Sequence, residues 1–407
     1  MQVGILGYGK EGKSAEQYFQ KRGAKVEIID DFDPKDLNGR DFNDFDLILR
    51  SPSVPPQQNF SSMTKYFFDH CPCPIIGVTG TKGKGTTCSL ITDLFKALDQ
   101  KVWLVGNIGN PALDILDDIK PNDVVIYEMS SFQLWDLDVS PKIAVILGIE
   151  PDHLNVHKDF TDYVQAKANI VKHQTATDVC IYYSKNPHSL QIAQLSSAQK
   201  LAYPLKHTEL TKVLSHLNIP GKHNQDNAEA ALLAVSSFYH IELTDFIKKY
   251  SQKIITTFAK FQGLPHRLQY LRTLNQVKYF DDNFSTTPTS LEVALKAFPE
   301  QPIVLIAGGR DKTNNQDLPE IANYIQSTSN LKKTILIGES GKELIKLLEH
   351  AELADSLPNA LLKARASAEQ LSQPAIVLMS PAAASFDMFD NVYARGAEFQ
   401  KLVRELV

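Results

Sequence analysis

The sequence predicts an α/β protein, and two observations support this class. Short apolar runs that are typical of buried strands alternate with helix-compatible segments along most of the chain. Parallel strands need crossover connections, usually helices, so this alternation favours largely parallel sheets. In addition, a chain of 407 residues is too long for one compact core. We therefore expect several α/β domains rather than one.

Breaks rich in proline or glycine suggest where the domains meet. They lie at 51–56, 71–74 and 263–265, and such residues punctuate regular structure. We expect a Rossmann-like N-terminal unit, a central parallel sheet and a Rossmann-like C-terminal unit. The predicted domain ranges are 1–72, 73–265 and 266–407.

Bulk composition narrows the class of protein. Hydrophobic residues make up 43% and charged residues 22% of the chain, as in ordinary globular proteins. The net charge of −5 argues against nucleic-acid binding through a broad basic surface. The four cysteines form no metal-ligand spacing, so we expect free thiols in a reducing compartment. Neither a signal peptide nor a membrane-spanning apolar run is evident, so we expect a cytoplasmic protein without membrane partners.

The first unit begins with a dinucleotide-binding pattern. Val3–Leu6 is typical of a buried strand, and Gly7–Gly12 reads G-x-G-x-x-G. A helix over Ser14–Lys21 and a strand over Val26–Ile29 follow, and the strand ends at Asp30. An NAD-dependent oxidoreductase is therefore one interpretation. The length available before the next nucleotide loop is about half of a full dinucleotide fold, which counts against it.

A phosphate-binding loop is predicted where the second unit begins. The apolar run Ile75–Val78 precedes a glycine-rich turn and a helix expected from Thr86. Gly80, Gly83 and Gly85 would let successive backbone N–H groups point at an anion. Lys84 would supply a charge for the outer phosphates, and Thr86 a hydroxyl for Mg²⁺. Gly85 departs from the usual pattern, because a hydroxyl residue normally follows the lysine.

Polar residues follow the other expected strands of this unit, which are Val102–Val105, Val124–Tyr127, Ile143–Leu147 and Val179–Tyr183. Glu128 follows the second of these strands, and Asp152-His153 lies after the third. Lys167 lies near the middle of a helix expected over Phe160–His173. Each residue alone has an ordinary structural explanation. Their joint position near the carboxyl ends of parallel strands predicts one site with the phosphate loop.

A third α/β unit follows a helix that begins near Gly221. Asn224 and Asn227 lie one turn apart on that helix, where they could cap it or contact a ligand. Strands are expected at Val277–Phe280, Ile303–Ala307, Thr334–Ile337 and Ala375–Met379. Helices are expected around Leu291–Phe298, Ile321–Ile325, Lys342–Leu348 and Val392–Leu406.

Taken together, the motifs resemble those of the Mur ligase family, which builds the peptide of bacterial cell-wall precursors. They are Thr79–Thr87, Glu128–Leu134, Asp152-His153, Gly221–Asn227, His266-Arg267 and Ser380–Ser385. The strings Ser130–Leu134 and Ser380–Asn391 look most like those of members that add D-glutamate. The resemblance runs from about Gly77 to the C-terminus and is weaker before it.

The resemblance implies an N-terminal UDP-binding domain, a central P-loop ATPase-type domain and a C-terminal amino-acid domain. ATP would phosphorylate a UDP-linked muramoyl acceptor, and the amine of D-glutamate would displace the phosphate. A cytoplasmic monomer that uses ATP and Mg²⁺ is expected.

By resemblance, the roles fall on three sets of residues. The nucleotide would contact Gly80, Thr81, Lys82, Gly83, Lys84, Gly85, Thr86, Thr87, Asn224, Asn227, Arg267 and Asp282. Mg²⁺ would be held by Thr86, Glu128, His153 and Lys167, the last as a carbamate. Catalysis would depend on Lys84, Glu128, His153 and Lys167. Acceptor and amino acid would contact Asn107, Ser131, Thr286, Lys312, Ser385 and Phe386.

Some positions depart from the family pattern. Phe284 stands where a lysine is usual, and Val392 where an aromatic residue is common. Asp30-Asp31-Phe32 offers no basic contact for a uridine substrate. Within the same fold, a folylpolyglutamate synthase-like ligase is an alternative, because it shares the Gly-Lys-Gly loop and adds glutamate to a different acceptor. The string Glu128–Leu134 and the end of the third unit count against it. Because of Phe284, a nucleotide-binding protein that has lost turnover is another alternative.

Overall fold

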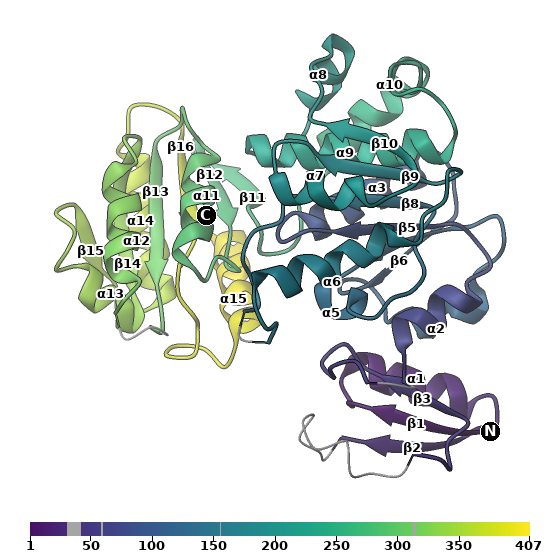
Figure 1. Ribbon diagram of the computed structural model, residues 1–407. Helices are drawn as coiled ribbons and strands as arrows, with labels where there is room; N and C mark the ends of the chain where they lie inside the picture. The colour runs from purple at the N-terminus through teal and green to yellow at the C-terminus, as the bar shows by residue number, and fades with distance from the viewer. Residues whose placement is uncertain (31–41, 58–59, 155, 312–314) are drawn as a thin grey trace. The chain divides into compact units, whose positions relative to one another are not determined.

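The computed structural model describes residues 1–30, 42–57, 60–154, 156–311 and 315–407. By compactness the chain divides into two units. The first consists of Met1–Leu217 with Gln225–Ala259, and the second of Asn218–Asn224 with Lys260–Val407. Three separate sheets lie within residues 1–72, 73–265 and 266–407, the three ranges expected for the domains (Figure 1). The exact domain boundaries stay a prediction.

The N-terminal sheet has four parallel strands in the order β2-β1-β3-β4. Its strands are β1 (Gln2–Leu6), β2 (Lys25–Ile29), β3 (Leu47–Arg50) and β4 (Ser61–Ser62). Helices α1 (Lys10–Gln20) and α2 (Met63–His70) belong to the same region. The predicted first helix therefore begins four residues earlier than expected, directly after Gly9.

The central sheet has six parallel strands in the order β10-β9-β8-β5-β7-β6. The strands are β5 (Ile75–Thr79), β6 (Val102–Gly106), β7 (Val124–Glu128), β8 (Ile143–Ile146), β9 (Val179–Tyr183) and β10 (Gln199–Tyr203). The helices are α3 (Lys84–Ala97), α4 (Ala112–Ile115), α5 (Ser131–Leu134), α6 (Phe160–Lys172), α7 (Pro187–Gln194), α8 (Thr208–Leu214), α9 (Lys222–Phe238) and α10 (Leu243–Lys260), with a 3₁₀ turn at Leu116–Asp118. Every residue of β5 and β7 is buried, as expected for parallel strands covered on both faces.

The C-terminal sheet also has six strands, in the order β11-β12-β16-β13-β14-β15. They are β11 (Gln269–Leu274), β12 (Val277–Asp281), β13 (Ile303–Gly308), β14 (Leu331–Ile337), β15 (Ala351–Leu353) and β16 (Ala375–Met379). The helices are α11 (Pro288–Lys296), α12 (Leu318–Ser327), α13 (Gly338–Leu344), α14 (Leu357–Glu369) and α15 (Val392–Glu405). Only β11 is antiparallel to its neighbour among the described strands.

Local sequence explains several helix starts. Asp159 accepts a hydrogen bond from the Asp162 backbone at the start of α6, and Asn391 accepts one from Ala394 at the start of α15. Short polar side chains at this position satisfy backbone N–H groups that have no partner inside the helix. At the start of α11, Thr287 caps the helix and Pro288 supplies the fixed φ that a first turn accepts.

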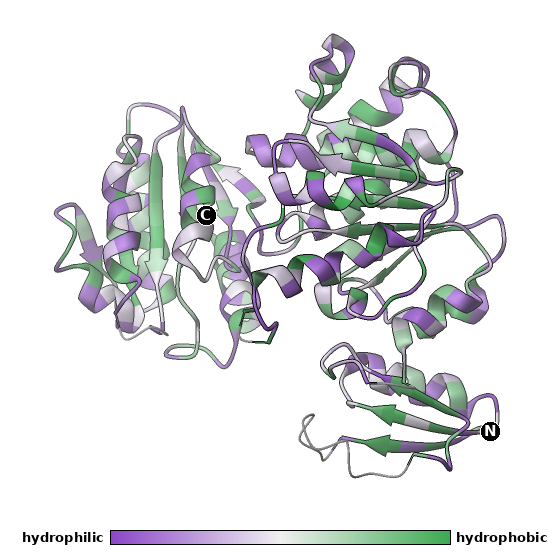
Figure 2. Cartoon of the chain, viewed as in Figure 1, coloured by the Kyte–Doolittle hydropathy of each residue, from purple (hydrophilic) through white to green (hydrophobic). Residues whose placement is uncertain are grey.

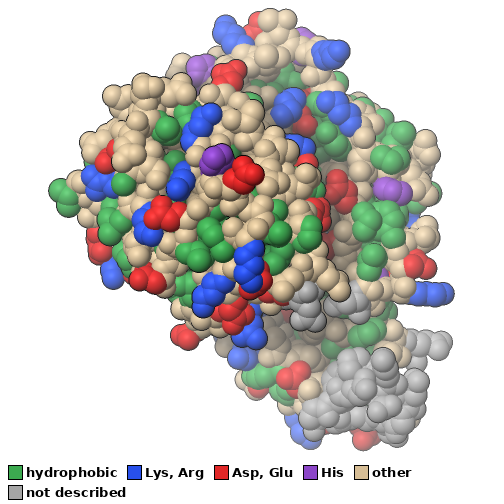
Figure 3. All heavy atoms as spheres, turned by 90° about the vertical axis from the view of Figure 1, so that its left-hand side faces the viewer, with side chains coloured by type: hydrophobic (Ala, Val, Ile, Leu, Met, Phe, Trp, Pro, Cys, Tyr) green, Lys and Arg blue, Asp and Glu red, His purple; other side chains and the backbone are tan. Residues whose placement is uncertain are grey.

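The surface and interior follow ordinary rules. Figure 2 shows the strands of the six-stranded sheets mainly in hydrophobic colours and the helices with hydrophilic outer residues. On the described part of the face in Figure 3, basic and acidic side chains are interspersed rather than gathered into one basic surface. No single described helix is long and apolar enough to cross a membrane. The pair α9 and α10 passes that test only when taken together, and its two helices are bent by 106°.

The C-terminal unit differs from the expectations in the start of one helix and in three elements that were not expected, which are β11, β15 and α14. The helix expected over Lys342–Leu348 is α13, which begins four residues earlier, because backbone and side-chain hydrogen bonds between Ser340 and Gly309 fix its first turn. The strand β11 was not expected at all. It forms a hairpin with β12 through Asn275 and Gln276, both at positive φ (49° and 63°). This is the geometry of a type I′ turn, but without the glycine that usually marks it in a sequence.

Candidate functional site

The phosphate-binding loop predicted from the sequence joins β5 to α3. The helix begins at Lys84, two residues earlier than expected. Gly80 (φ 151°) and Gly83 (φ 85°) take backbone conformations that other residues rarely adopt. Gly83, the residue before the first turn of α3, has no side chain with which to cap the helix. The positive end of the helix dipole at this point can attract an anion.

Asn227 lies directly against this loop. A Cβ atom placed on Gly83 would lie 2.6 Å from Asn227 Oδ1, so a side chain here would require Asn227 to move. This contact and the φ angle therefore both favour glycine. Asn224, the other predicted asparagine, donates its side-chain N–H to the Pro220 carbonyl at 2.6 Å. Whether either residue meets the adenine stays a prediction.

Two lysine amines converge on one carbonyl oxygen of the loop. Lys84 Nζ donates to Gly80 O at 2.9 Å and also to Thr81 O. Lys167 Nζ, from the middle of α6, donates to the same Gly80 oxygen at 3.0 Å and lies 3.4 Å from Thr79 Oγ1. The structure thus brings together Lys84 and Lys167, which are far apart in the sequence.

Lys167 is almost completely buried, with 1% of its surface exposed. Burial lowers the pKa of its ammonium group well below the usual range, and the nearby Lys84 charge lowers it further. The carboxylates of Asp152 and Glu128 oppose this only in part. A neutral amine is a nucleophile, whereas an ammonium group is not.

Glu128 ends β7 with its side chain buried. One carboxylate oxygen, Oε1, accepts a hydrogen bond from Asn107 Nδ2 at 2.9 Å. The other, Oε2, is buried and has no hydrogen-bond partner among the described residues. Asn107 therefore orients Glu128 in this structure. Since a buried carboxylate oxygen without a partner is costly, Oε2 is suited to a bound cation.

The metal site predicted from sequence is only partly assembled by side chains. Thr87 Oγ1 is buried without a partner in the described structure, while Thr86 is only half-buried. His153 is half-exposed, and its Nε2 lies 3.6 Å from Asp152 Oδ2. No group of three or more His, Cys, Asp or Glu side chains placed for a metal ion occurs among the described residues. Glu128 and the threonine hydroxyls are nevertheless the oxygen ligands that Mg²⁺ prefers.

A second histidine near the site was not singled out from the sequence. His157 is 2% exposed. Its Nδ1–H donates a hydrogen bond to Asp162 Oδ2 at 2.8 Å, and its Nε2 is hydrogen-bonded to Ser131 Oγ at 2.9 Å. Its ring also stacks on Phe132. Ser131, a predicted substrate contact, is thus held by His157. The sequence offered only the His153/His157 spacing, which does not reveal which ring is buried.

Two acidic residues at the N-terminal G-x-G-x-x-G loop form hydrogen bonds with other groups of the protein. Asp30 Oδ1 accepts a hydrogen bond from the Tyr8 backbone at 2.8 Å. In a dinucleotide-binding domain the corresponding acidic group binds the ribose. Burial raises the pKa of Glu11 to about 7, and its Oε1 accepts a hydrogen bond from Gln133 Nε2 at 2.8 Å. These contacts, with the four-stranded sheet, do not favour an oxidoreductase.

In the C-terminal unit, Asp282 is buried, with 9% of its surface exposed. Its oxygens accept hydrogen bonds from Ser380 Oγ at 2.8 Å and the Leu268 backbone at 3.1 Å. Burial raises the pKa of this carboxyl group to about 7. The structure thus gives Asp282 a structural role, and its predicted contact with the nucleotide stays a prediction.

Phe284, at the family's lysine position, lies within an aromatic group. Its ring contacts those of His266 and Tyr393, each with ring centroids 5.3 Å apart. The Arg267 guanidinium lies 5.6 Å from the Phe284 ring centre, a cation–π distance. An apolar ring therefore positions the predicted nucleotide contact Arg267.

The residues predicted for the amino acid are only partly described. Ser385 is buried and its Oγ has no hydrogen-bond partner within the described structure. Phe386 is 64% exposed, and Thr286 is half-buried. Lys312 lies outside the described residues. An unpartnered buried hydroxyl beside an exposed aromatic ring is compatible with a ligand contact.

Arg395 was also missed by the sequence reasoning. Its buried guanidinium donates to the Ala383 and Ala384 carbonyls, each at 3.0 Å, and to Asn283 Oδ1 at 2.6 Å. It therefore fixes the backbone of the loop that carries Ser385. Burial lowers the pKa of Arg395 to about 10, so it remains charged near neutral pH.

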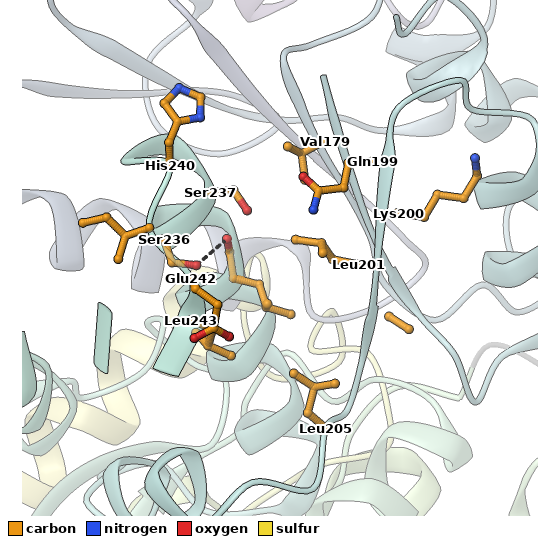
Figure 4. Close-up of a pocket in the computed structure, with 13 residues that line it drawn as sticks. Val179, Gln199, Lys200, Leu201, Leu205, Ser236, Ser237, His240, Glu242 and Leu243 are labelled. Carbon is orange, nitrogen blue, oxygen red and sulfur yellow. Dashed lines mark hydrogen bonds between the residues drawn. The ribbon is translucent and has the colours of Figure 1, made fainter. Parts of the chain in front are cut away.

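A cavity of about 560 Å³ lies elsewhere in the central region. Figure 4 shows side chains of α9 on one side and of β10 on the other, with Ser236 hydrogen-bonded to a backbone carbonyl. Its lining comes from β10 and the residue Leu205 after it, from the end of α9 and from the connection between α9 and α10. None of the described residues predicted for the nucleotide, the metal or the substrates lines this cavity, so it is not part of the site.

A glycine-rich loop between a buried parallel strand and a helix is typical of a nucleotide-binding protein. Comparison with known proteins identifies the family within this class. The model of the Mur ligase middle domain matches residues 78–213, and that of the Mur ligase, glutamate ligase domain matches 266–383. A UDP-N-acetylmuramoylalanine–D-glutamate ligase of Clostridium kluyveri is 32% identical over 99% of this chain and 96% of the relative.

Solved structures share the fold. The UDP-N-acetylmuramate-alanine ligase of Thermotoga maritima covers 99% of both chains with a TM-score of 0.59 at 18% identity. The MurF ligase of the same organism, solved with ADP, covers 99% of this chain and 95% of its own with a TM-score of 0.61 at 15% identity. The chain belongs to the Mur ligase family and is an ATP-dependent ligase of peptidoglycan synthesis. The resemblance inferred from the motifs is confirmed.

Proposed function

We propose that this ligase joins D-glutamate to UDP-N-acetylmuramoyl-L-alanine. The observation that carries the proposal is the near-full-length similarity to a ligase named for this pair, together with a phosphate loop beside buried Lys167 and Glu128. A carboxylate is a poor acyl donor until one of its oxygens can leave as phosphate. The reaction therefore needs both a triphosphate site and an amine pocket.

In the proposed reaction, a carboxylate oxygen of the acceptor attacks the γ-phosphorus of ATP, and ADP leaves. The amine of D-glutamate then attacks the carbonyl carbon of the acyl phosphate, loses a proton and expels phosphate. Lys84 and the N–H groups at the start of α3 stabilise the transferring phosphoryl group. Because phosphoryl transfer needs little covalent chemistry from the protein, charge and position at this loop dominate.

Mg²⁺ would neutralise phosphate charge and is proposed to be held by Glu128, with Thr86, His153 and Lys167. Support comes from the buried, unpartnered Glu128 Oε2. Lys167 can join such a set only as an anion. Its buried amine with a lowered pKa suits addition to CO₂, which forms a carbamate. The unmodified ammonium group would repel the cation.

The remaining roles are also proposals. Asn224, Asn227, Arg267 and Asp282 would contact the nucleotide, and residues 1–72 the UDP group. D-glutamate would be bound by Thr286, Lys312, Ser385 and Phe386, for which the unpartnered Ser385 hydroxyl is the support. Action as a cytoplasmic monomer stays a prediction.

Product analysis tests the proposal. The purified chain is given ATP, Mg²⁺ and either UDP-N-acetylmuramoyl-L-alanine or a pteroate acceptor, with D-glutamate, L-glutamate or D-glutamine in turn. We expect phosphate release and a new amide only with the muramoyl acceptor and D-glutamate. Turnover with the pteroate acceptor would support the folate-type alternative. Nucleotide binding without any product would support the alternative that turnover has been lost.

A further inference from the structure

Cys71 and Cys73 lie side by side in the segment that joins α2 to β5 (Figure 1). Their sulfur atoms are 3.8 Å apart, with Pro72 between the two residues. The other two cysteines, Cys88 and Cys180, are buried. The proposed ligase reaction makes no use of the pair.

The two thiols differ in exposure and in acidity. Cys71 is half-buried and therefore reachable from solvent, whereas Cys73 is 8% exposed. A hydrogen bond from Cys73 lowers the pKa of Cys71, while the same contact and burial raise that of Cys73. Thiolates react with oxidants and thiols hardly do, so the more accessible sulfur is also the more reactive one.

We propose that Cys71 and Cys73 form an oxidation site, at which a hydroperoxide converts the two thiols into a reversible disulfide. In the first step the Cys71 thiolate attacks one peroxide oxygen, the O–O bond breaks, and sulfenic acid forms on Cys71. The attacked oxygen stays on the sulfur, and the other oxygen leaves as alkoxide or hydroxide and takes up a proton. In the second step Cys73 loses its proton and attacks the Cys71 sulfur. An S–S bond forms, the S–O bond breaks, and water leaves.

The spacing of the two cysteines along the chain is compatible with this product. Residues two apart in a chain have Cα atoms at most about 7 Å apart, and disulfides span about 4.4–6.8 Å. The spacing of the two residues along the chain is therefore compatible with a disulfide, and the sulfur atoms, now 3.8 Å apart, must approach to bonding distance. The segment is anchored on both sides, since the Cys71 N–H donates to Phe67 O at 2.8 Å and Val125 N donates to Pro74 O at 3.1 Å. Oxidation would thus act on the connection between the first two sheets.

Thiol mapping of the full chain tests the proposal. The reduced protein is treated with about one equivalent of hydrogen peroxide, labelled with N-ethylmaleimide under denaturing conditions, digested and analysed by mass spectrometry. We expect the peptide with Cys71 and Cys73 to lack both labels and to be lighter by two hydrogen atoms. Cys88 and Cys180 should stay fully labelled, and a dithiol should restore all four thiols.

Three variants sharpen the test. Cys71→Ser should form no disulfide, and the loss of thiols should slow at least about tenfold. Cys73→Ser should instead accumulate a sulfenic acid on Cys71 that dimedone traps. Cys180→Ser, the matched control, should form the disulfide at the wild-type rate. Full labelling of Cys71 and Cys73 after peroxide, or equal thiol loss in Cys71→Ser and wild type, would overturn the proposal, and wild-type mapping decides this even if one variant misfolds.

Discussion

Lys167→Met examines whether the buried amine of α6 is neutral in the folded protein. Methionine keeps a similar length and removes the titratable nitrogen. The variant loses the hydrogen bonds to Gly80 O and Thr79 Oγ1, which together contribute about 2 kcal/mol. This loss of hydrogen bonds does not depend on pH. The contribution of Lys167 protonation to the free energy of unfolding does depend on pH, and it distinguishes a neutral amine from a charged one.

Because the folded-state pKa of Lys167 lies well below its usual range, the unfolded chain binds more protons than the folded chain. This holds from the folded-state pKa up to about 10.4, the value in an unfolded chain. Within that window, the free energy of unfolding of the wild type rises by about 1.4 kcal/mol per pH unit relative to the variant. Below the folded-state pKa the full penalty is present and the difference becomes constant.

The measurement is urea unfolding followed by tryptophan fluorescence in buffers free of bicarbonate, at about pH 7, 8 and 9. Both tryptophans, Trp103 and Trp135, lie in residues 73–265, so the signal reports the region that contains Lys167. Lys172→Met on the exposed last turn of α6 is the control and should show no such slope. A difference between Lys167→Met and wild type that stays flat over this range would mean that Lys167 is charged when folded, and the proposed carbamate would lose its basis.

The other expected outcomes concern turnover and packing. Lys167→Ala should be inactive in the ligase assay, and a small added carboxylic acid should restore part of the rate by filling the vacated anionic position; activity without the additive would refute the role. Lys84→Ala should lower kcat at least about a hundredfold with an unchanged circular dichroism spectrum, whereas Lys96→Ala, exposed on the same helix, should not. Gly83→Ala should destabilise the chain by about 1–3 kcal/mol in urea unfolding, since φ is 85° and an asparagine fills the space; equal stability would contradict the packing. Lys312→Ala should raise KM for D-glutamate strongly and leave KM for ATP little changed, and the wild type should use D-glutamine poorly; equal use of both amino acids would show that the pocket does not recognise a carboxylate.

Much of the fold was predictable because apolar runs and glycine-rich turns carry local information. The phosphate loop, the strand ending in Glu128 and the helix bearing Lys167 all lie where the sequence predicts. What failed depended on distant contacts. The start of α13 is set by Gly309, which lies in the loop after β13 and 31 residues before Ser340, and β11 depends on a turn that lacks its usual glycine.

The sequence predicted which residues lie in the candidate site, but not which of their side chains contact one another. A sequence does not show that Asn107 binds Glu128, because 20 intervening residues must fold before the two meet. Nor does it show which of His153 and His157 is buried, since both have the same chemistry. Burial decides these roles, and burial is a property of the packed chain.

The single Gly80 oxygen that accepts hydrogen bonds from both Lys84 and Lys167 has a calorimetric consequence. Two ammonium groups that donate to one oxygen repel each other. In the loop without a nucleotide, a state in which only one of the two lysines is charged is therefore favoured. A triphosphate would draw Lys84 toward itself and bring negative charge close to an unmodified Lys167, whose pKa would rise toward its usual range. Nucleotide binding would then take up a proton from the medium. The measured enthalpy of nucleotide binding would then depend on the ionisation enthalpy of the buffer. Bicarbonate, by converting the Lys167 amine into a carbamate, would abolish this dependence.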